Sequence, residues 1–250
     1  MADMAFGIDI GGSGVKGAPV DLGTGELTAE RVRLPTPLPA TPKAVARTAA
    51  KLLESFGDTA GLPVGITVPS VVTHGITRSA ANIDKKWIDC AAEDLLADVL
   101  GRPVSLLNDA DAAGLAESCY GAAKGQPGLV IVTTLGTGIG TAMIYDGVLM
   151  PNSELGHLEI DGFDAEARAA ASARTKEDLS WPAYGKRLQR YYQTLELLFT
   201  PDLIVVGGGI SRNSDKFLPY LNLSTPIVPA QLRNQAGIIG AARYAATHRL

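Results

Sequence analysis

The sequence predicts an α/β protein with two lobes. Two stretches far apart in the chain, residues 6–25 and 129–147, follow one plan: an apolar strand, a glycine-rich turn, a second strand and a tight turn. A third instance is expected over residues 203–211, where an apolar run again meets glycines. The long and unequal spacing is typical of a duplicated lobe rather than of a solenoid.

The first half of the chain predicts strands that alternate with helices. Residues 5–10 predict a strand, and a second short strand is expected over 18–22, after the glycine turn. Thr41 and Pro42 form a typical helix start, with apolar residues at helical spacing up to Gly57. The pattern then predicts a strand over 64–68, a polar loop over 73–89 that contains Trp87, a helix over 93–100, a strand over 103–107 and a small-residue helix over 109–120.

The pattern restarts after residues 122–128 (AAKGQPG), which read as a linker. The second half predicts strands over 129–134 and 141–145, an alanine-rich helix over 165–173, a helical stretch over 178–199 and a last helix from about Gln235. We expect residues 1–108 and 235–250 to form a smaller N-terminal lobe, and residues 109–234 a larger C-terminal one.

The composition argues against several functional classes. The formal net charge of −4 gives no general attraction to nucleic acid or to an anionic membrane. The chain has no apolar run of the ~18 residues that a membrane span needs, and its start does not resemble a signal peptide, so we expect a cytoplasmic protein. With two cysteines, Cys90 and Cys119, and three scattered histidines, neither a disulfide framework nor structural zinc is expected.

In the first glycine-rich turn, residues 9–17 (DIGGSGVKG), the spacing of Gly12, Gly14 and Gly17 matches a dinucleotide-binding fingerprint, and Glu30 lies near the expected distance for a ribose contact. That fingerprint requires a helix that opens on the glycines, whereas Pro19 and the tight turn at Gly23 favour a hairpin. A hairpin can hold an anion on its backbone amides, with Ser13 and Lys16 available to phosphate. The alternative is that the glycines only permit a tight turn.

The segment LNDADAAG places Asn108, Asp109 and Asp111 at the start of a helix. Helix capping would explain these residues. A carboxylate at a helix N-terminus also stays ionised and can accept a proton from a sugar hydroxyl as it attacks phosphorus, a reaction that depends mainly on positioning and charge neutralisation. Asp9 is a candidate carboxylate for Mg²⁺, directly or through water, with turn capping as the alternative.

These motifs, in this order, resemble the ROK family of sugar kinases and repressors in the actin-like ATPase superfamily. The resemblance rests on DIGGSGVKG at 9–17, VPS at 68–70 with Asn82 and Trp87, LNDADAAGLAE at 107–117, LGTGIG at 135–140, ELGH at 154–157 and VVGGGIS at 205–211. It implies a duplicated actin-like (ribonuclease H-like) fold with a cleft between its lobes, and transfer of a phosphoryl group to a sugar.

One segment departs from the family pattern. The family follows its ELGH motif with a zinc-binding cysteine cluster, but residues 158–174 (LEIDGFDAEARAAASAR) contain no cysteine, so zinc is not expected. This segment, NIDKKW at 82–87 and PAQLRNQAGIIGAA at 229–242 resemble the polyphosphate glucokinases of actinobacteria. That subgroup includes members that also use ATP and members that accept mannose.

The resemblance implies a role for each matching residue. Asp109 would be the general base toward the 6-hydroxyl of glucose, and Asn108 would hold the neighbouring hydroxyl. The rest of the sugar site would be Asn82, Glu154 and His157, with either Glu166 or Glu159. The donor phosphates would be held by Asp9, Gly11, Gly12, Ser13, Gly14, Lys16, Thr137 and Gly138, and the nucleoside end of a donor would lie at Gly207, Gly208 and Gly209.

The sequence thus predicts a Mg²⁺-dependent enzyme that phosphorylates glucose, and also mannose if it follows some relatives, from polyphosphate and ATP, with a homodimer implied by the resemblance. A strictly ATP-dependent glucokinase and a non-catalytic sugar-sensing module are the alternatives. A repressor would need a DNA-binding segment ahead of Phe6. Candidates for a polyphosphate track are Arg174, Lys176, Lys186, Arg187, Arg190, Arg212 and Lys216, although each could simply face solvent.

Overall fold

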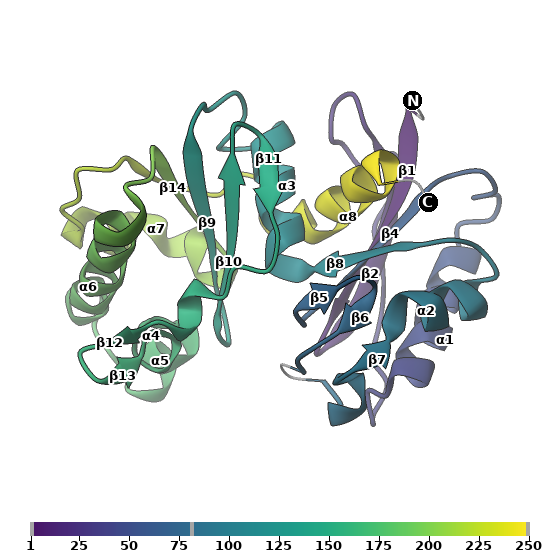
Figure 1. Cartoon of the computed structure of the whole chain (residues 1–250), viewed down its shortest axis with the longest axis horizontal. Coiled ribbons are helices and arrows are strands. Elements are labelled where there is room, and N and C mark those ends of the chain that lie inside the picture. The colour runs from purple at the N-terminus through teal and green to yellow at the C-terminus, as the bar shows by residue number, and fades with distance from the viewer. Residues whose placement is uncertain (1–2, 81–82, 249–250) are drawn as a thin grey trace. The chain divides into compact units, whose positions relative to one another are not determined.

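The computed structural model describes residues 3–80 and 83–248 (Figure 1). The chain divides into two compact units: Met1–Ala112 with Gln235–Leu250, and Ala113–Asn234. The lobe boundary expected at residue 108 and the division observed after Ala112 both fall at the start of helix α3 (Asp109–Tyr120). Among the described residues, no helix has the length and apolar character needed to span a bilayer.

The first unit is built on a five-stranded sheet in the order β3-β2-β1-β4-β8. Strand β1 pairs antiparallel with β2 and parallel with β4, and β4 pairs parallel with β8. The strands are β1 (Met4–Gly11), β2 (Gly14–Asp21), β3 (Val32–Leu34), β4 (Val64–Val68) and β8 (Ser105–Asn108). Strand β2 starts at Gly14 rather than at the expected residue 18, because the turn takes up just Gly12 and Ser13.

Helices cover both faces of this sheet. Phe6 and Ile8 share a buried apolar cluster with residues of α1 (Pro42–Glu54) and α2 (Ala92–Leu100), whereas Gly7, between them, faces α8 (Ala236–Thr247). Successive residues of a strand point to opposite faces, so α8 lies on the face opposite to α1. Helix α1 begins as predicted, with the Thr41 hydroxyl accepting from the Ala44 amide at 3.4 Å and Pro42 in the first turn.

Helix α8 packs so closely on the sheet that the two backbones are in contact. Figure 1 shows α8 beside β1 and β4. A Cβ on Gly7 would lie 1.9 Å from the carbonyl oxygen of Ile238, and a Cβ on Gly65 would lie 1.8 Å from that of Ala241. Any side chain at these two positions would push the helix away from the sheet. The glycines therefore set the depth at which α8 packs.

The segment 73–89, expected to be a polar loop, contains ordered structure. It contributes to a three-stranded sheet formed by β5 (Val72–Thr73), β6 (Ile76–Thr77) and β7 (Cys90–Ala91), and it includes the 3-10 helix Lys85–Trp87. Trp87 is fully buried and donates its indole N–H to the carbonyl of Ala40 at 2.9 Å. Strands of two residues leave no periodic pattern in a sequence, which is why they were missed.

The second unit repeats the sheet of the first. Its order is β11-β10-β9-β14-β15, again with two antiparallel pairings followed by two parallel ones. The strands are β9 (Leu129–Leu135), β10 (Ile139–Tyr145), β11 (Val148–Met150), β14 (Leu203–Gly207) and β15 (Ile227–Pro229). The predicted duplication is confirmed at the level of strand order and direction.

The helices of the second unit correct two expectations. The alanine-rich stretch 165–173 forms two short helices, α4 (Ala165–Ala169) and α5 (Ala171–Lys176), because Ala170 is extended with ψ 156°. The third glycine-rich turn is not a hairpin, since β14 leads into the 3-10 helix Gly209–Asn213. The other elements are the ribbon β12 (Glu159–Ile160) and β13 (Phe163–Asp164), α6 (Trp181–Phe199) and α7 (Ser214–Phe217).

The packing of α8 leads to a prediction about stability. Gly7→Ala forces a methyl group against the backbone of Ile238, so we expect it to lower the free energy of unfolding by about 3 kcal/mol. Gly11→Ala, on the same strand, is the matched control because the nearest atom lies at an ordinary 3.4 Å, and its effect should stay within about 0.5 kcal/mol. Urea denaturation of both variants measures the difference; equal losses would contradict this account of the packing.

Candidate active site

The first glycine-rich turn is a tight hairpin between β1 and β2. Gly11 pairs with Gly14, so strand follows strand without a helix, and the dinucleotide fingerprint is excluded. Arg33, on the neighbouring β3, donates from Nη2 to the carbonyl of Ser13 at 2.7 Å. A Cβ on Gly14 would lie 2.6 Å from Nε of Arg33, so the glycine makes room for this arginine. The guanidinium adds a positive charge at the turn.

Arg33 is a candidate site residue that sequence analysis missed. Its strand is three residues long and is separated from the glycine turn by a loop, so no motif joins the two. The register places Arg33 opposite Lys16 on the adjacent strand, which brings two cations to the same end of the hairpin. The signal that places Arg33 beside the turn is the pairing of β2 with β3, and this pairing cannot be deduced from local sequence patterns.

Asp9 and Lys16 form a cross-strand ion pair. The Lys16 ammonium lies 3.2 Å from Oδ2 of Asp9, and the Thr67 hydroxyl donates to Oδ1 at 3.2 Å. These partners are side chains rather than turn amides, so the contacts of Asp9 with Lys16 and Thr67 differ from those of a turn cap. The described residues include no cluster of three or more histidine, cysteine or acidic side chains arranged for a metal.

The Asn108 side chain caps helix α3. Its Oδ1 accepts from the amides of Ala110 at 2.7 Å and Asp111 at 3.2 Å, and its Nδ2 donates to the carbonyl of Ser70 at 3.0 Å. One N–H of the amide remains for a ligand. Asp109 is therefore the first residue of the helix rather than its cap, half-buried at the positive end of the helix dipole.

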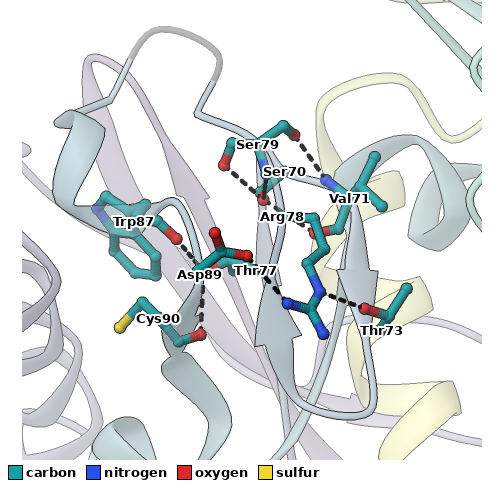
Figure 2. Close-up of polar contacts among 9 residues, drawn as sticks. All are labelled: Ser70, Val71, Thr73, Thr77, Arg78, Ser79, Trp87, Asp89 and Cys90. Atoms are coloured by element: carbon teal, nitrogen blue, oxygen red, sulfur yellow. Dashed lines mark hydrogen bonds and ion pairs between the residues drawn. The ribbon is translucent and has the colours of Figure 1, made fainter.

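Ser70 also holds the segment that follows β4, as Figure 2 shows. Its hydroxyl donates to the carbonyl of Ser79 at 2.7 Å, and the Ser79 hydroxyl accepts from the amide of Val71 at 3.0 Å. Arg78 donates to the Thr73 hydroxyl at 2.8 Å and to the Asp89 carboxylate at 2.9 Å. The predicted sugar ligand Asn82 lies outside the described residues.

In the second unit, Glu166 supports the hairpin that joins β9 to β10. Its Oε2 accepts from the amide of Ile139 at 2.7 Å, and a Cβ on Gly138 would lie 2.2 Å from the same oxygen. The Ser172 hydroxyl donates to the carbonyl of Thr137 at 2.6 Å. The predicted phosphate-binding hairpin thus rests on α4 and α5, the segment where the chain departs from the family pattern.

Four ionisable groups, those of Glu154, His157, Asp164 and Glu166, influence one another beside this hairpin. Burial raises the pKa of Glu154; His157 opposes this shift and Glu166 adds to it. A hydrogen bond with Asp164, 2.8 Å from Nδ1, raises the pKa of His157 against the effect of burial. Burial would raise the pKa of Asp164, yet the hydrogen bond with His157 keeps it below the usual value. Glu159 is exposed. Glu166, and not Glu159, is among the groups that raise the pKa of Glu154 and of His157.

Several residues of the predicted polyphosphate track already have partners. Arg187 lies 2.8 Å from the carboxylate of Glu177, and Arg190 lies 2.7 Å from that of Asp161. The guanidinium of Arg174 stacks over the ring of Trp181 at 3.7 Å, and the Lys216 ammonium lies 5.6 Å from the same ring. For Arg187 and Arg190, the structural role is the better supported one.

Residues 5–172 match the family model described as ROK family. The chain belongs to the ROK family. It is 54% identical to a polyphosphate glucokinase of Mycobacterium tuberculosis (strain CDC 1551 / Oshkosh) over 95% of this chain and 89% of that protein. It is 51% identical to the polyphosphate glucokinase of Mycobacterium leprae over 95% of this chain and 73% of that one.

The crystal structure of an inorganic polyphosphate/ATP-glucomannokinase from Arthrobacter sp. strain KM matches this ROK protein with a TM-score of 0.92. The two chains are 54% identical, and the match covers 98% of this chain and 99% of that one. The predicted fold class, the duplicated two-lobe actin-like fold, is confirmed together with the predicted family. The roles of the individual site residues stay predictions.

The His157–Asp164 pair leads to a prediction about pH. Because the folded-state pKa of His157 is raised, the pair stabilises the fold below the pKa of an unfolded histidine and loses this contribution as the pH rises through the folded value. Asp164→Asn keeps a side chain able to cap α4 and removes the charge, so the pKa of His157 should fall. NMR titration of the imidazole measures the shift.

Asp161→Asn is the control for this titration. Asp161 lies on the same turn but pairs with Arg190, so its replacement should leave the pKa of His157 unchanged. An unaltered His157 titration in Asp164→Asn would refute the assignment of Asp164 as the group that holds the imidazolium.

Proposed function

We propose that this ROK-family protein transfers the terminal phosphoryl group of inorganic polyphosphate to the 6-hydroxyl of glucose, giving glucose 6-phosphate and a chain shorter by one phosphate. The similarity to the mycobacterial polyphosphate glucokinases over nearly the whole chain carries this proposal. The proposal also includes ATP as a second donor and mannose as a second acceptor. Both are supported by the name of the Arthrobacter polyphosphate/ATP-glucomannokinase.

Asp109 is the proposed general base. Its carboxylate takes the proton of the 6-hydroxyl while the hydroxyl oxygen forms a bond to phosphorus and the bridging oxygen of the donor leaves. The first turn of α3 suits this role because the helix dipole keeps a carboxylate ionised there. Asn108 has one N–H left after its contacts with Ser70 and the helix amides, and this N–H would donate to the neighbouring hydroxyl.

The donor phosphates would meet the two glycine hairpins and the cations beside the first one. Backbone amides at Gly11–Gly14 and at Thr137 and Gly138 would donate to phosphate oxygens, and Lys16 and Arg33 would neutralise charge. Gly208 has a φ of 79°, and a Cβ there would lie 2.3 Å from the carbonyl oxygen of Leu135, so Gly208 keeps the backbone close to the second hairpin. A Cβ on Gly209 would meet no atom within 4 Å, so this position is open.

Mg²⁺ completes the proposed donor site. A single carboxylate, Asp9, beside the Thr67 hydroxyl fits an ion that keeps most of its waters and binds mainly to phosphate oxygens. When bound, the ion supplies positive charge to the phosphates of the donor. The ion pair with Lys16 holds the Asp9 side chain at the end of β1 next to the glycine turn.

Glu154, His157 and Glu166 are the proposed ligands of the sugar hydroxyls. Carboxylates accept hydrogen bonds and a protonated imidazole donates them, which matches hydroxyls that do both. Asp164 supports the donor role because it raises the pKa of His157. A homodimer and a cytoplasmic location, without nucleic-acid or membrane partners, also belong to the proposal, and the negative net charge agrees with the last point.

The deciding assay measures glucose 6-phosphate with Mg²⁺ and either long-chain polyphosphate or ATP. We expect turnover with both donors, and Asp109→Asn should lower kcat by roughly 10²–10⁴-fold with each, because the variant lacks the base. Asp98→Asn makes the same chemical change at an exposed position of α2, and this control variant should keep full activity. Turnover with ATP alone would establish the strictly ATP-dependent alternative, and turnover with neither would leave the sugar-sensing module.

The choice between Glu166 and Glu159 has its own test. Glu166→Gln should raise the KM for glucose by about tenfold or more, the effect expected when a hydrogen bond to a charged group is weakened. Glu159→Gln makes the same chemical change on an exposed side chain and should leave KM within about twofold. Because Glu166 also holds the Ile139 amide, a melting temperature is measured beside each KM. The reverse order of the two KM effects would assign the role to Glu159.

A further inference from the structure

A pocket of about 450 Å³ opens in the second unit where strands β14 and β15 end. Its walls include Ser211, Arg212 and Ser214 from the segment after β14, and Gln231 and Arg233 from the segment after β15. The volume falls within the usual range for small-molecule sites, roughly 300–1,000 Å³. The two guanidinium groups and the Ser214 hydroxyl are donors, whereas the Ser211 hydroxyl already donates to the carbonyl of Gly208 at 2.8 Å. The chemistry of the walls therefore suits an anion.

The two arginines of this pocket differ from the other arginines of the unit. Residues 113–234 contain six arginines, and four have partners: Arg187 and Arg190 pair with carboxylates, and Arg168 and Arg174 stack on aromatic rings. Within residues 3–80 and 83–248, the side chain of neither Arg212 nor Arg233 has a hydrogen bond, an ion pair or a ring contact. Both are exposed, so their donors are available to a ligand.

The buried carboxylate of Glu117 holds two residues of the pocket wall, Ala122 and Gln231. It is 1% exposed and accepts from three amides: Ala122 at 2.7 Å, Gln231 at 3.2 Å and Leu232 at 2.8 Å. These bonds join the end of α3 to the segment that carries Arg233. Arg233 itself has a φ of 50°, a conformation that side chains rarely adopt, so its backbone is held by its surroundings rather than by local preference.

The pocket lies at the same edge of the sheet as the proposed donor hairpin. Strands β9, β14 and β15 are parallel, and their carboxyl ends are Leu135, Gly207 and Pro229. Ligands of open α/β sheets bind beyond this edge. The hairpin follows β9 and the pocket follows β14 and β15, so a chain of phosphates held at the hairpin can continue toward the pocket.

We propose that Arg212 and Arg233 form a subsite for phosphates of inorganic polyphosphate that lie beyond the phosphoryl group being transferred. This inference rests on the proposed function and extends it by separating the donors. A long polyphosphate would reach the subsite, whereas tripolyphosphate, with only two phosphates beyond the transferred group, would gain fewer of these contacts. ATP carries a neutral nucleoside where the polyphosphate chain carries further charges, so ATP gains less from two arginines.

The test compares Arg212→Ala, Arg233→Ala and the double variant with wild type on long-chain polyphosphate, tripolyphosphate and ATP. The KM for long-chain polyphosphate should rise at least about fivefold in each single variant and further in the double variant, with kcat little changed. The KM for ATP and for tripolyphosphate should change less than twofold. Arg47→Ala removes the same charge from an exposed position of α1 and should leave all three KM values unchanged.

A binding experiment keeps this inference separate from the proposed reaction. In the Asp109→Asn background, affinity for labelled long-chain polyphosphate is measured over a series of salt concentrations, with and without the two arginine substitutions. Loss of the arginines should weaken binding and lower its dependence on salt, because fewer phosphate charges are neutralised. Arg212→Lys and Arg233→Lys keep the charge and should restore part of the affinity.

The possible results separate the two ideas. Equal KM increases for long-chain polyphosphate and ATP, or a larger increase for ATP, would overturn the subsite and indicate a role at the nucleoside end of the donor. Unchanged polyphosphate affinity in the double variant would overturn it as well. If wild type fails to phosphorylate glucose from polyphosphate while the arginine variants still weaken polyphosphate binding, the reaction fails and the subsite stands.

Discussion

The side chain of Asn108 is buried where β8 ends and α3 begins, and both of its polar atoms are used. The oxygen caps the helix that begins with Asp109, and the nitrogen holds the carbonyl of Ser70, whose hydroxyl in turn holds Ser79. One amide therefore positions the proposed base relative to the segment after β4. An aliphatic residue at 108 would leave two helix amides and one carbonyl without partners, which is costly in a buried position.

In the second unit, carboxylates rather than an amide side chain bind backbone groups and hold the segments near the proposed site. Glu166 holds the Ile139 amide at the second hairpin, and Glu117 holds three amides at the far end of the same sheet edge. Glu166 binds the first amide of β10, and the three amides that Glu117 binds lie outside the helices and strands. A charged acceptor makes stronger hydrogen bonds than a neutral one, so these loops are held without any addition to the apolar core.

The segment 158–174 is organised by hydrogen bonds in a region where the family resemblance would imply a cysteine cluster. Asp164 caps α4 through the Ala167 amide and pairs with His157, and Glu166 on that helix reaches the hairpin. The ribbon formed by β12 and β13 closes the segment on itself. Three polar side chains thus connect the proposed sugar ligand, a short helix and the proposed phosphate-binding turn.

The sequence by itself determined the class of the fold, the family and most of the regular elements. Apolar periodicity, the Thr41–Pro42 helix start and the repeated glycine turns are local features, and α1, β4, β9 and the capping role of Asn108 followed from them. Motif order was specific enough to indicate the family. Asn82 is named by its motif alone, because it lies outside the described residues.

The tertiary structure decided which residues share a site. Arg33 reaches the first turn through strand pairing, Trp87 is buried in the apolar core of the first unit, and Arg212 and Arg233 line one pocket because β14 and β15 are neighbours. The same information shows that Glu166 contacts the second hairpin whereas Glu159 is exposed, and that Arg187 and Arg190 pair with carboxylates whereas the Arg212 side chain does not. Each of these relations joins residues far apart in the chain, so composition, periodicity and spacing contain no record of them.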